Sequence, residues 1–229
     1  MGKFNNRAKK IFIVCGQYGS GKTEFCVNLA LTLRRETGVK VSIADYDVIN
    51  PYFRSREKAK FLLEYGIDIL GNSTGNLTGT DLPALSANIA SPILNNEYLI
   101  IDLAGSRNGL KPLAAMRDSL GNDFDFLCVL NAFRPETKSE TLMINTVRSL
   151  EGYSGIKMNG IIHNSHLVHE TTAADVLYGQ DMVKAASGKL RVPVMFTQIK
   201  RDIYDEISDK IIGRPIIFEK LAMRENWQD

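Results

Sequence analysis

The stretch Gly16-Gln17-Tyr18-Gly19-Ser20-Gly21-Lys22-Thr23 joins two segments of different periodicity. Residues 11–15 before it are an apolar, β-branched-rich run, which is typical of a buried strand. After it, Phe25, Leu29 and Leu33 recur at helical spacing until Gly38. A glycine-rich strand-to-helix loop can turn its N–H groups toward an anion, and the helix N-terminus adds partial positive charge. The stretch matches the pattern G-x-x-x-x-G-K-[ST], so we expect all eight residues to bind phosphate groups.

The last residues of this loop are expected to do more than wrap the phosphates of a nucleoside triphosphate. Lys22 is predicted to reach the β- and γ-phosphates and to act in catalysis. The Thr23 hydroxyl is predicted to bind Mg²⁺. Glu24, the next residue, is included in the predicted nucleotide site.

A second metal ligand is predicted at the end of another apolar run. Asp102 closes residues 98–102, the position at which the carboxylate of a Walker B strand stands. The alternative is a cap or turn residue. The segment Asp102-Leu103-Ala104-Gly105 also has the D-x-x-G form of a switch that senses the γ-phosphate.

Strand-like and helix-like patterns alternate along the whole chain. The strand-like runs are continuously apolar, which favours a mainly parallel sheet covered on both faces. Without an internal repeat or linker, residues 1–229 are predicted to form one P-loop NTPase domain with a three-layer α/β/α, doubly wound fold. The predicted strands are 11–15, 39–44, 67–70, 98–102, 124–130, 158–163 and 192–196; a polar loop is expected over 71–80, a helix over 135–150 and a short tail helix over 216–224.

The overall composition argues against some classes of function and does not identify one. The chain has 28 basic and 26 acidic residues, so its net charge of +2 gives no argument for nucleic acid or anionic membrane as a partner. Cys15, Cys26 and Cys128 lie in apolar runs without a C-x-x-C pair, as expected of buried thiols in a reducing cytoplasm. No apolar run approaches the ~18 residues that span a bilayer. We therefore expect a cytoplasmic protein.

Five segments in order resemble the MinD/ParA/ArsA-like ATPases of the SIMIBI class, the CobQ/CobB/MinD/ParA nucleotide-binding family. The resemblance extends over nearly the whole chain. The segments are Tyr18–Thr23, Ala44-Asp45-Tyr46-Asp47, the Asp102 segment, 159–164 ending in Asn164, and Val192-Pro193-Val194 followed by Ile203 and Gly213-Arg214-Pro215-Ile216.

The resemblance implies roles for three further residues. Asp47 would order the attacking water, and Asp45 would bind the metal through its coordinated water. Asn164 would read the base of the nucleotide. The alternatives are a pair of turn-forming aspartates and a turn asparagine.

One departure from the family concerns dimerisation. The family pattern K-G-G-x-G-K-[ST] begins with a lysine that reaches the partner's nucleotide across a dimer, and this chain has Gln17 and Tyr18 at the first two positions. The resemblance therefore leaves a homodimer open. Arg54 and Arg56 are an alternative source of positive charge, or they are solvated.

The predicted nucleotide is ATP or ADP with Mg²⁺. Guanine selection usually needs an N-K-x-D pattern, whereas Ser165-His166-Leu167 follows Asn164. The sequence therefore indicates a slowly hydrolysing ATPase that acts as a switch on an unidentified protein partner. A small-molecule kinase or ligase of the same fold and a non-hydrolysing nucleotide-binding adaptor are the alternatives.

The three histidines of the chain, His163, His166 and His169, are clustered. Their i, i+3, i+6 spacing drifts across a helix face, and no cysteine or carboxylate pair is close in sequence. We expect them at the nucleotide pocket or at the surface rather than on zinc.

Overall fold

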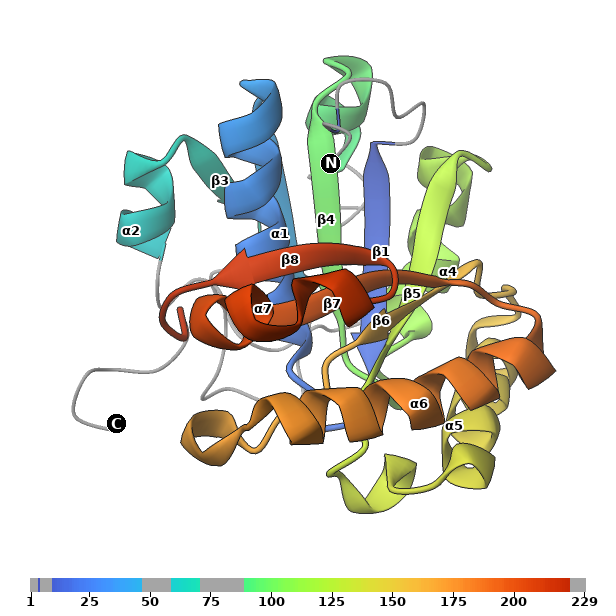
Figure 1. Cartoon of the computed structure of the whole chain (residues 1–229). Coiled ribbons are helices and arrows are strands. Elements are labelled where there is room, and N and C mark those ends of the chain that lie inside the picture. Colours follow the sequence, from blue (N-terminus) through green and yellow to red (C-terminus); the bar gives the residue numbers. More distant parts are fainter. Residues whose placement is uncertain (1–3, 5–9, 47–58, 71–88, 223–229) are drawn as a thin grey trace.

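The structure is a computed structural model that describes residues 4, 10–46, 59–70 and 89–222 (Figure 1). Its described strands form one parallel sheet in the order β3-β2-β4-β1-β5-β6-β7-β8. The strands are β1 Ile11–Gly16, β2 Val41–Tyr46, β3 Ile67–Leu70, β4 Tyr98–Leu103, β5 Phe124–Leu130, β6 Gly160–His163, β7 Val194–Lys200 and β8 Arg214–Phe218. The helices are α1 Lys22–Thr37, α2 Ala59–Glu64, α4 Lys111–Leu120, α5 Glu140–Ser154, α6 Ala173–Leu190 and α7 Arg201–Ile207.

Helices cover both faces of the sheet, as the continuously apolar strands require. Successive residues of β1 point to opposite faces, so Phe12 and Val14 pack in one core with α1, while Ile13 and Cys15 pack in the other with α4, α5 and α6. Helices α5 and α6 lie side by side in the second layer (Figure 1). The predicted three-layer α/β/α fold is confirmed.

The parallel sheet brings the carboxyl ends of its strands to one edge. Strand β1 lies between β4 and β5 in the sheet, and β5 is the next strand after β4 in the sequence. The chain therefore passes from one side of β1 to the other, and such a reversal opens a crevice where ligands bind in open α/β sheets. The loop that follows β1 begins at this crevice.

The end of the chain folds differently from the prediction. Strand β7 begins two residues later than expected and ends four later, and Arg214–Phe218 forms an eighth strand rather than the start of a tail helix. A short apolar run suits either structure, and here the edge of β7 offers backbone partners. The Arg214 guanidinium also pairs with Glu36 of α1 at 2.5 Å and lies 3.6 Å from the ring centroid of Phe4.

The helix predicted over 135–150 is divided in two. Pro135–Thr137 is a 3₁₀ turn, and α5 begins only at Glu140, after the Ser139 hydroxyl accepts a hydrogen bond from the Leu142 N–H at 3.3 Å. The polar loop predicted over 71–80 lies outside the described residues. None of the described helices is long and apolar enough to cross a membrane.

Candidate functional site

The loop between β1 and α1 has the backbone that an anion site needs. Gly19 and Gly21 have φ angles of 70° and 89°, in the left-handed region that favours glycine. Gly21 caps α1 without a side-chain hydrogen bond to the first turn. Lys22 is 6% exposed, and its ammonium donates to the Gln17 carbonyl at 3.4 Å. The loop therefore combines the N-terminus of a helix with a buried ammonium group.

The two predicted metal ligands touch each other at the start of α1. The Thr23 hydroxyl donates to the Asp102 carboxylate at 2.5 Å, and Asp102 is fully buried. Asp45 stands beside Asp102 in the register of β2 and β4. The pKa of the nearby Cys26 thiol is raised, mainly by burial and then by the charge of Asp102, while Lys22 acts in the opposite direction. The Thr23 hydroxyl and the carboxylates of Asp102 and Asp45 offer oxygen ligands, which Mg²⁺ prefers.

The D-x-x-G segment after β4 lies directly against the phosphate loop. A Cβ atom added to Gly105 would lie 1.9 Å from the Gly16 carbonyl oxygen and 3.0 Å from the Gln17 nitrogen. Only glycine allows these two backbones to come so close. Neither segment can therefore move toward the other without displacing it.

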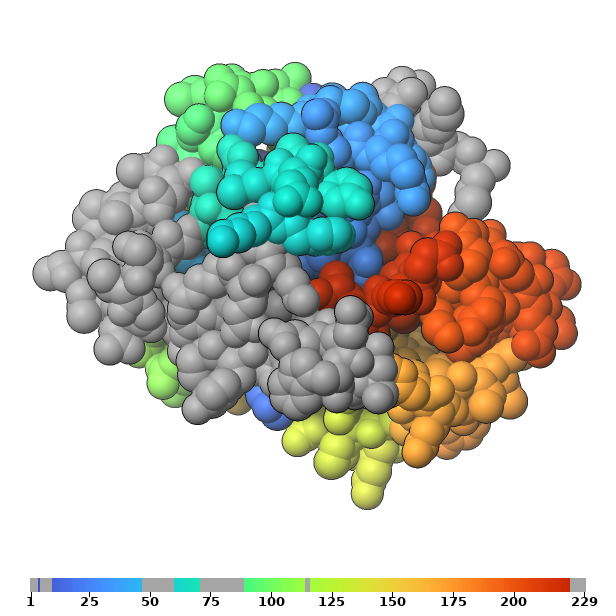
Figure 2. Space-filling model, turned by 90° about the vertical axis from the view of Figure 1, so that its left-hand side faces the viewer, coloured from blue at the N-terminus to red at the C-terminus, as the bar shows by residue number. Residues whose placement is uncertain are grey.

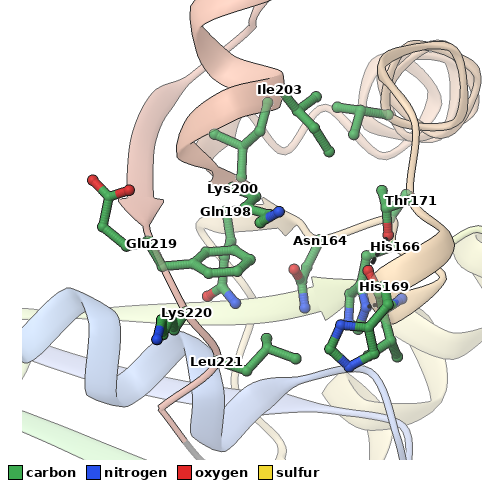
Figure 3. A pocket seen from close by; sticks show the side chains of 15 residues that line it. Asn164, His166, His169, Thr171, Gln198, Lys200, Ile203, Glu219, Lys220 and Leu221 are labelled. Atoms are coloured by element: carbon green, nitrogen blue, oxygen red, sulfur yellow. Dashed lines mark hydrogen bonds between the residues drawn. The ribbon is translucent and has the colours of Figure 1, made fainter. Parts of the chain in front are cut away.

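Asn164, the predicted base-reading residue, contacts the phosphate loop from the end of β6. Its amide nitrogen donates to the Ser20 carbonyl at 2.7 Å, and the side chain is 2% exposed. A carbonyl can only accept, so the amide nitrogen must face the loop. Figure 3 shows the amide oxygen of Asn164 turned the other way, toward Gln198.

A cavity of about 310 Å³ opens beside Asn164. Gln198 of β7 borders it, is 5% exposed, and has a buried Oε1 atom without a hydrogen-bond partner among the described residues. The walls come from the ends of β6 and β7 and from the segment after β8, namely Asn164, Ser165, His166, Val168, His169, Thr171, Val176, Gln198, Ile199, Lys200, Ile203, Phe218, Glu219, Lys220 and Leu221 (Figure 3).

The C-terminal segment closes this cavity on the side of α1. The Ala222 N–H donates to the Glu24 carboxylate at 2.7 Å, and the Asn28 amide donates to the same oxygen at 2.8 Å. Figure 2 shows the red C-terminal segment between the blue surface of α1 and the orange surface of the last helices. Glu24, a predicted nucleotide residue, thus binds the segment that follows β8.

The histidines take two different positions. His166 and His169 line the cavity, while His163 is fully buried at the end of β6, where burial lowers its pKa to about 3 and keeps the ring neutral. Among the described residues, no group of three or more His, Cys, Asp or Glu side chains is placed to hold a metal.

Some predicted residues contribute little contact or cannot be placed. Tyr18 projects from the loop and is 70% exposed. Gln17 contributes its carbonyl, which accepts from the Ser20 N–H at 3.2 Å as well as from Lys22. Asp47, Arg54 and Arg56 lie outside the described residues.

Sequence reasoning missed several residues of this edge. Gln198 and Lys200 were missed because β7 was predicted to end at residue 196. Asn131, which follows β5 directly, is fully buried; its carbonyl accepts from the Thr137 hydroxyl at 2.6 Å, and its amide donates to the His166 carbonyl at 3.3 Å. A polar residue directly after an apolar run was the available signal, as it had been for Asp102.

No protein-family model and no curated protein matches this sequence. Solved structures do resemble the chain. The signal recognition particle 54 kDa protein from Aeropyrum pernix K1, in complex with GDP, has a TM-score of 0.62 at 17% identity over 96% of this chain and 44% of that one. The signal recognition particle receptor FtsY from Elizabethkingia anophelis, also with GDP, has a TM-score of 0.61 at 15% identity over 87% of this chain and 60% of that one.

FtsY from Mycoplasma mycoides has a TM-score of 0.59 at 21% identity over 84% of this chain and 60% of that one. The chain therefore spans less than two thirds of the length of these proteins. At such low identity the likeness establishes the fold, which is that of an α/β P-loop NTPase. It does not single out the MinD/ParA-like branch.

Proposed function

We propose that this protein binds a nucleoside triphosphate with Mg²⁺ at the loop Gly16–Thr23 and works as a slowly hydrolysing nucleotide switch. The observation that supports this most is the hydrogen bond of 2.5 Å between the Thr23 hydroxyl and the buried Asp102 carboxylate. It brings together the two residues predicted to hold the metal, and the buried Lys22 directly precedes Thr23 in the chain. A glycine-rich turn alone would not require a buried carboxylate at this place.

In this proposal each residue of the site has its own role. The N–H groups of the loop and the Lys22 ammonium hold the phosphates and offset their charge. Thr23 and Asp102 would hold Mg²⁺, with Asp45 beside them in the sheet. Bound there, the metal ion neutralises the negative charge that develops on the phosphate oxygens. Asp47 is proposed, from the family resemblance, to orient the attacking water.

The switch follows from the contact between two backbones. Gly105 is pressed against Gly16 and Gln17, so a phosphate that moves the loop toward Gly105 would also displace the segment after β4. A segment whose position depends on the γ-phosphate can present or withdraw a binding surface. We propose a protein partner that reads this segment, as in the MinD/ParA-like ATPases that the sequence resembles.

The proposed base is adenine. With one N–H of its amide donated to the Ser20 carbonyl, Asn164 keeps its amide oxygen as an acceptor on the opposite side. Adenine presents a 6-amino donor, whereas guanine presents an oxygen acceptor at the same position. Gln198 adds an amide that can both donate and accept. The structural relatives with GDP make guanine the competing base.

Calorimetric titration with Mg²⁺-ATP and Mg²⁺-GTP tests both parts of the proposal. We expect ATP to bind more tightly than GTP, and Lys22→Ala to bind neither. Equal or tighter binding of GTP contradicts the adenine assignment but leaves the triphosphate site intact. Phosphate release without an added acceptor supports a switch ATPase over a small-molecule kinase. Tight ATP binding without any release would instead identify a non-hydrolysing adaptor.

A further inference from the structure

The turn after β5 places a guanidinium on the phosphate loop. A Cβ atom added to Gly19 would lie 3.3 Å from Cζ and 3.4 Å from Nε of Arg134, so the guanidinium packs directly on the backbone of Gly19. A residue with a side chain at position 19 would press against this guanidinium.

This guanidinium has no counter-ion within the described part of the chain. Its Nε atom is buried without a hydrogen-bond partner, and no ion pair or hydrogen bond of its side chain is found there. The adjoining loop already carries the buried Lys22 and the N-terminus of α1. Two cations around a helix N-terminus repel each other unless an anion lies between them.

The turn holds Arg134 in a defined position. The Arg134 N–H donates to the Asn131 carbonyl at 3.2 Å, and the Thr137 N–H donates to the Arg134 carbonyl at 2.9 Å. The Thr146 hydroxyl of α5 donates to the Glu136 carbonyl at 3.2 Å, which fixes the turn to the helix that follows. Because these bonds fix the backbone of the turn, no rearrangement of the turn is needed to bring Arg134 to the loop.

We propose that Arg134 binds the phosphate chain of the nucleotide and supplies, from the same subunit, a second positive charge beside that of Lys22. The loop has Gln17 where the MinD/ParA-like ATPases that the sequence resembles have a second lysine, and the guanidinium lies against Gly19 of the same loop. A planar guanidinium with several donors is suited to phosphate oxygens. This inference rests on the proposed nucleotide site and adds a residue to it.

The test compares Arg134→Ala and Arg134→Lys with the wild-type chain in titrations of Mg²⁺-ATP and Mg²⁺-ADP. One charge-assisted contact is worth about 1.5–3 kcal/mol, so we expect Arg134→Ala to weaken binding by about tenfold or more. Arg134→Lys should recover part of the loss, because the charge remains while the fork of donors is gone. Arg148→Ala, at an exposed position of α5, is the control and should bind like the wild type.

Thermal unfolding without nucleotide separates binding from a structural role. Since no counter-ion of Arg134 is found among the described residues, Arg134→Ala should unfold at the wild-type temperature or above, and only the rise in Tm on adding Mg²⁺-ATP should shrink. A loss of Tm without nucleotide, or wild-type affinity in Arg134→Ala, overturns the role of Arg134. If Lys22→Ala binds as tightly as the wild type, the nucleotide site itself is wrong, and the inference falls with it.

Discussion

The carboxyl edge of the sheet has two halves that are built in different ways. The half proposed to bind phosphate, called the phosphate half, is a single continuous stretch, Gly16–Thr23, whose Thr23 contacts Asp102 of β4. The half proposed to receive the base, called the base half, is assembled from the ends of β6 and β7 and from residues 218–221, which are up to about sixty positions apart in the chain. Asn164 joins the halves through its hydrogen bond to the Ser20 carbonyl.

This difference has a physical origin. Phosphate is bound by backbone N–H groups, and a glycine pattern encodes the backbone conformation locally. A base is bound by side chains and a cavity, and both depend on which strands become neighbours. The phosphate half should therefore fail when one residue is changed. The base half should respond by smaller changes in selectivity.

The largest effect should come from Lys22. Lys22→Ala removes a buried ammonium that would make two charge-assisted contacts, so Mg²⁺-ATP and Mg²⁺-GTP should both bind at least about 100-fold more weakly. Titration calorimetry measures both. Lys184→Ala, on the exposed face of α6, is the matched control. A change in one nucleotide only would mean that the two halves are not separate.

Acid should act on the base half through His163. Its pKa is lowered to about 3 in the folded chain, against 6.5 for a free imidazole, so the unfolded state takes up the proton first. Stability is then full above pH 6.5 and falls as the pH drops toward 3, by roughly 2–3 kcal/mol at pH 4.5. Urea unfolding at pH 7 and 4.5 should show a smaller loss for His163→Gln. An equal loss in both proteins would assign the acid sensitivity to other groups.

Magnesium should matter to the phosphate half alone. Asp102→Asn removes the carboxylate that pairs with Thr23, so the gain in ATP affinity caused by Mg²⁺ should fall by about 30-fold, while binding in EDTA changes little. Titrations with and without EDTA measure this gain. Asp118→Asn, exposed on α4, should keep the full effect of the metal. An unchanged gain in Asp102→Asn would move the metal site elsewhere.

The same contrast explains what could be predicted from the sequence. The sheet followed from continuously apolar runs, and the phosphate loop from one pattern in its strand–helix context. Asp102 was found because it ends such a run. Gln198 was not, because β7 continues through a polar stretch that pairs with β8, and that pairing is a long-range contact. The pairing of β7 with β8 was also not foreseen for the second strand. Residues 216–224 were therefore predicted to be a helix, although Arg214–Phe218 is strand β8.

Asn164 should affect both halves. Asn164→Ala leaves the Ser20 carbonyl without its buried donor, which costs about 1–3 kcal/mol. Binding of inorganic pyrophosphate, which has no base, should therefore weaken by about tenfold, as should ATP binding. Pyrophosphate titration makes the distinction. If only the ratio of ATP to GTP affinity changes, Asn164 reads the base and does not support the loop.

The smallest effect should come from Gln198, and a second buried glutamine makes it measurable. Gln180 and Gln198 are both 5% exposed, but Gln180 donates to the Lys210 carbonyl and accepts from the Ile212 N–H, each at 2.9 Å, whereas no hydrogen bond of the Gln198 amide is found among the described residues. Replacing an amide that has no hydrogen-bond partner with leucine removes the cost of burying that amide. Replacing a hydrogen-bonded amide leaves its partners buried without a hydrogen bond.

Gln198→Leu should therefore unfold at or above the wild-type Tm and change the ratio of ATP to GTP affinity by roughly three- to tenfold. Gln180→Leu should lose stability and keep the ratio. Thermal unfolding and parallel titrations of both variants decide the matter. A stable Gln198→Leu protein with an unchanged ratio of ATP to GTP affinity would mean that the cavity beside β7 does not receive the base. The base would then have to bind at another place.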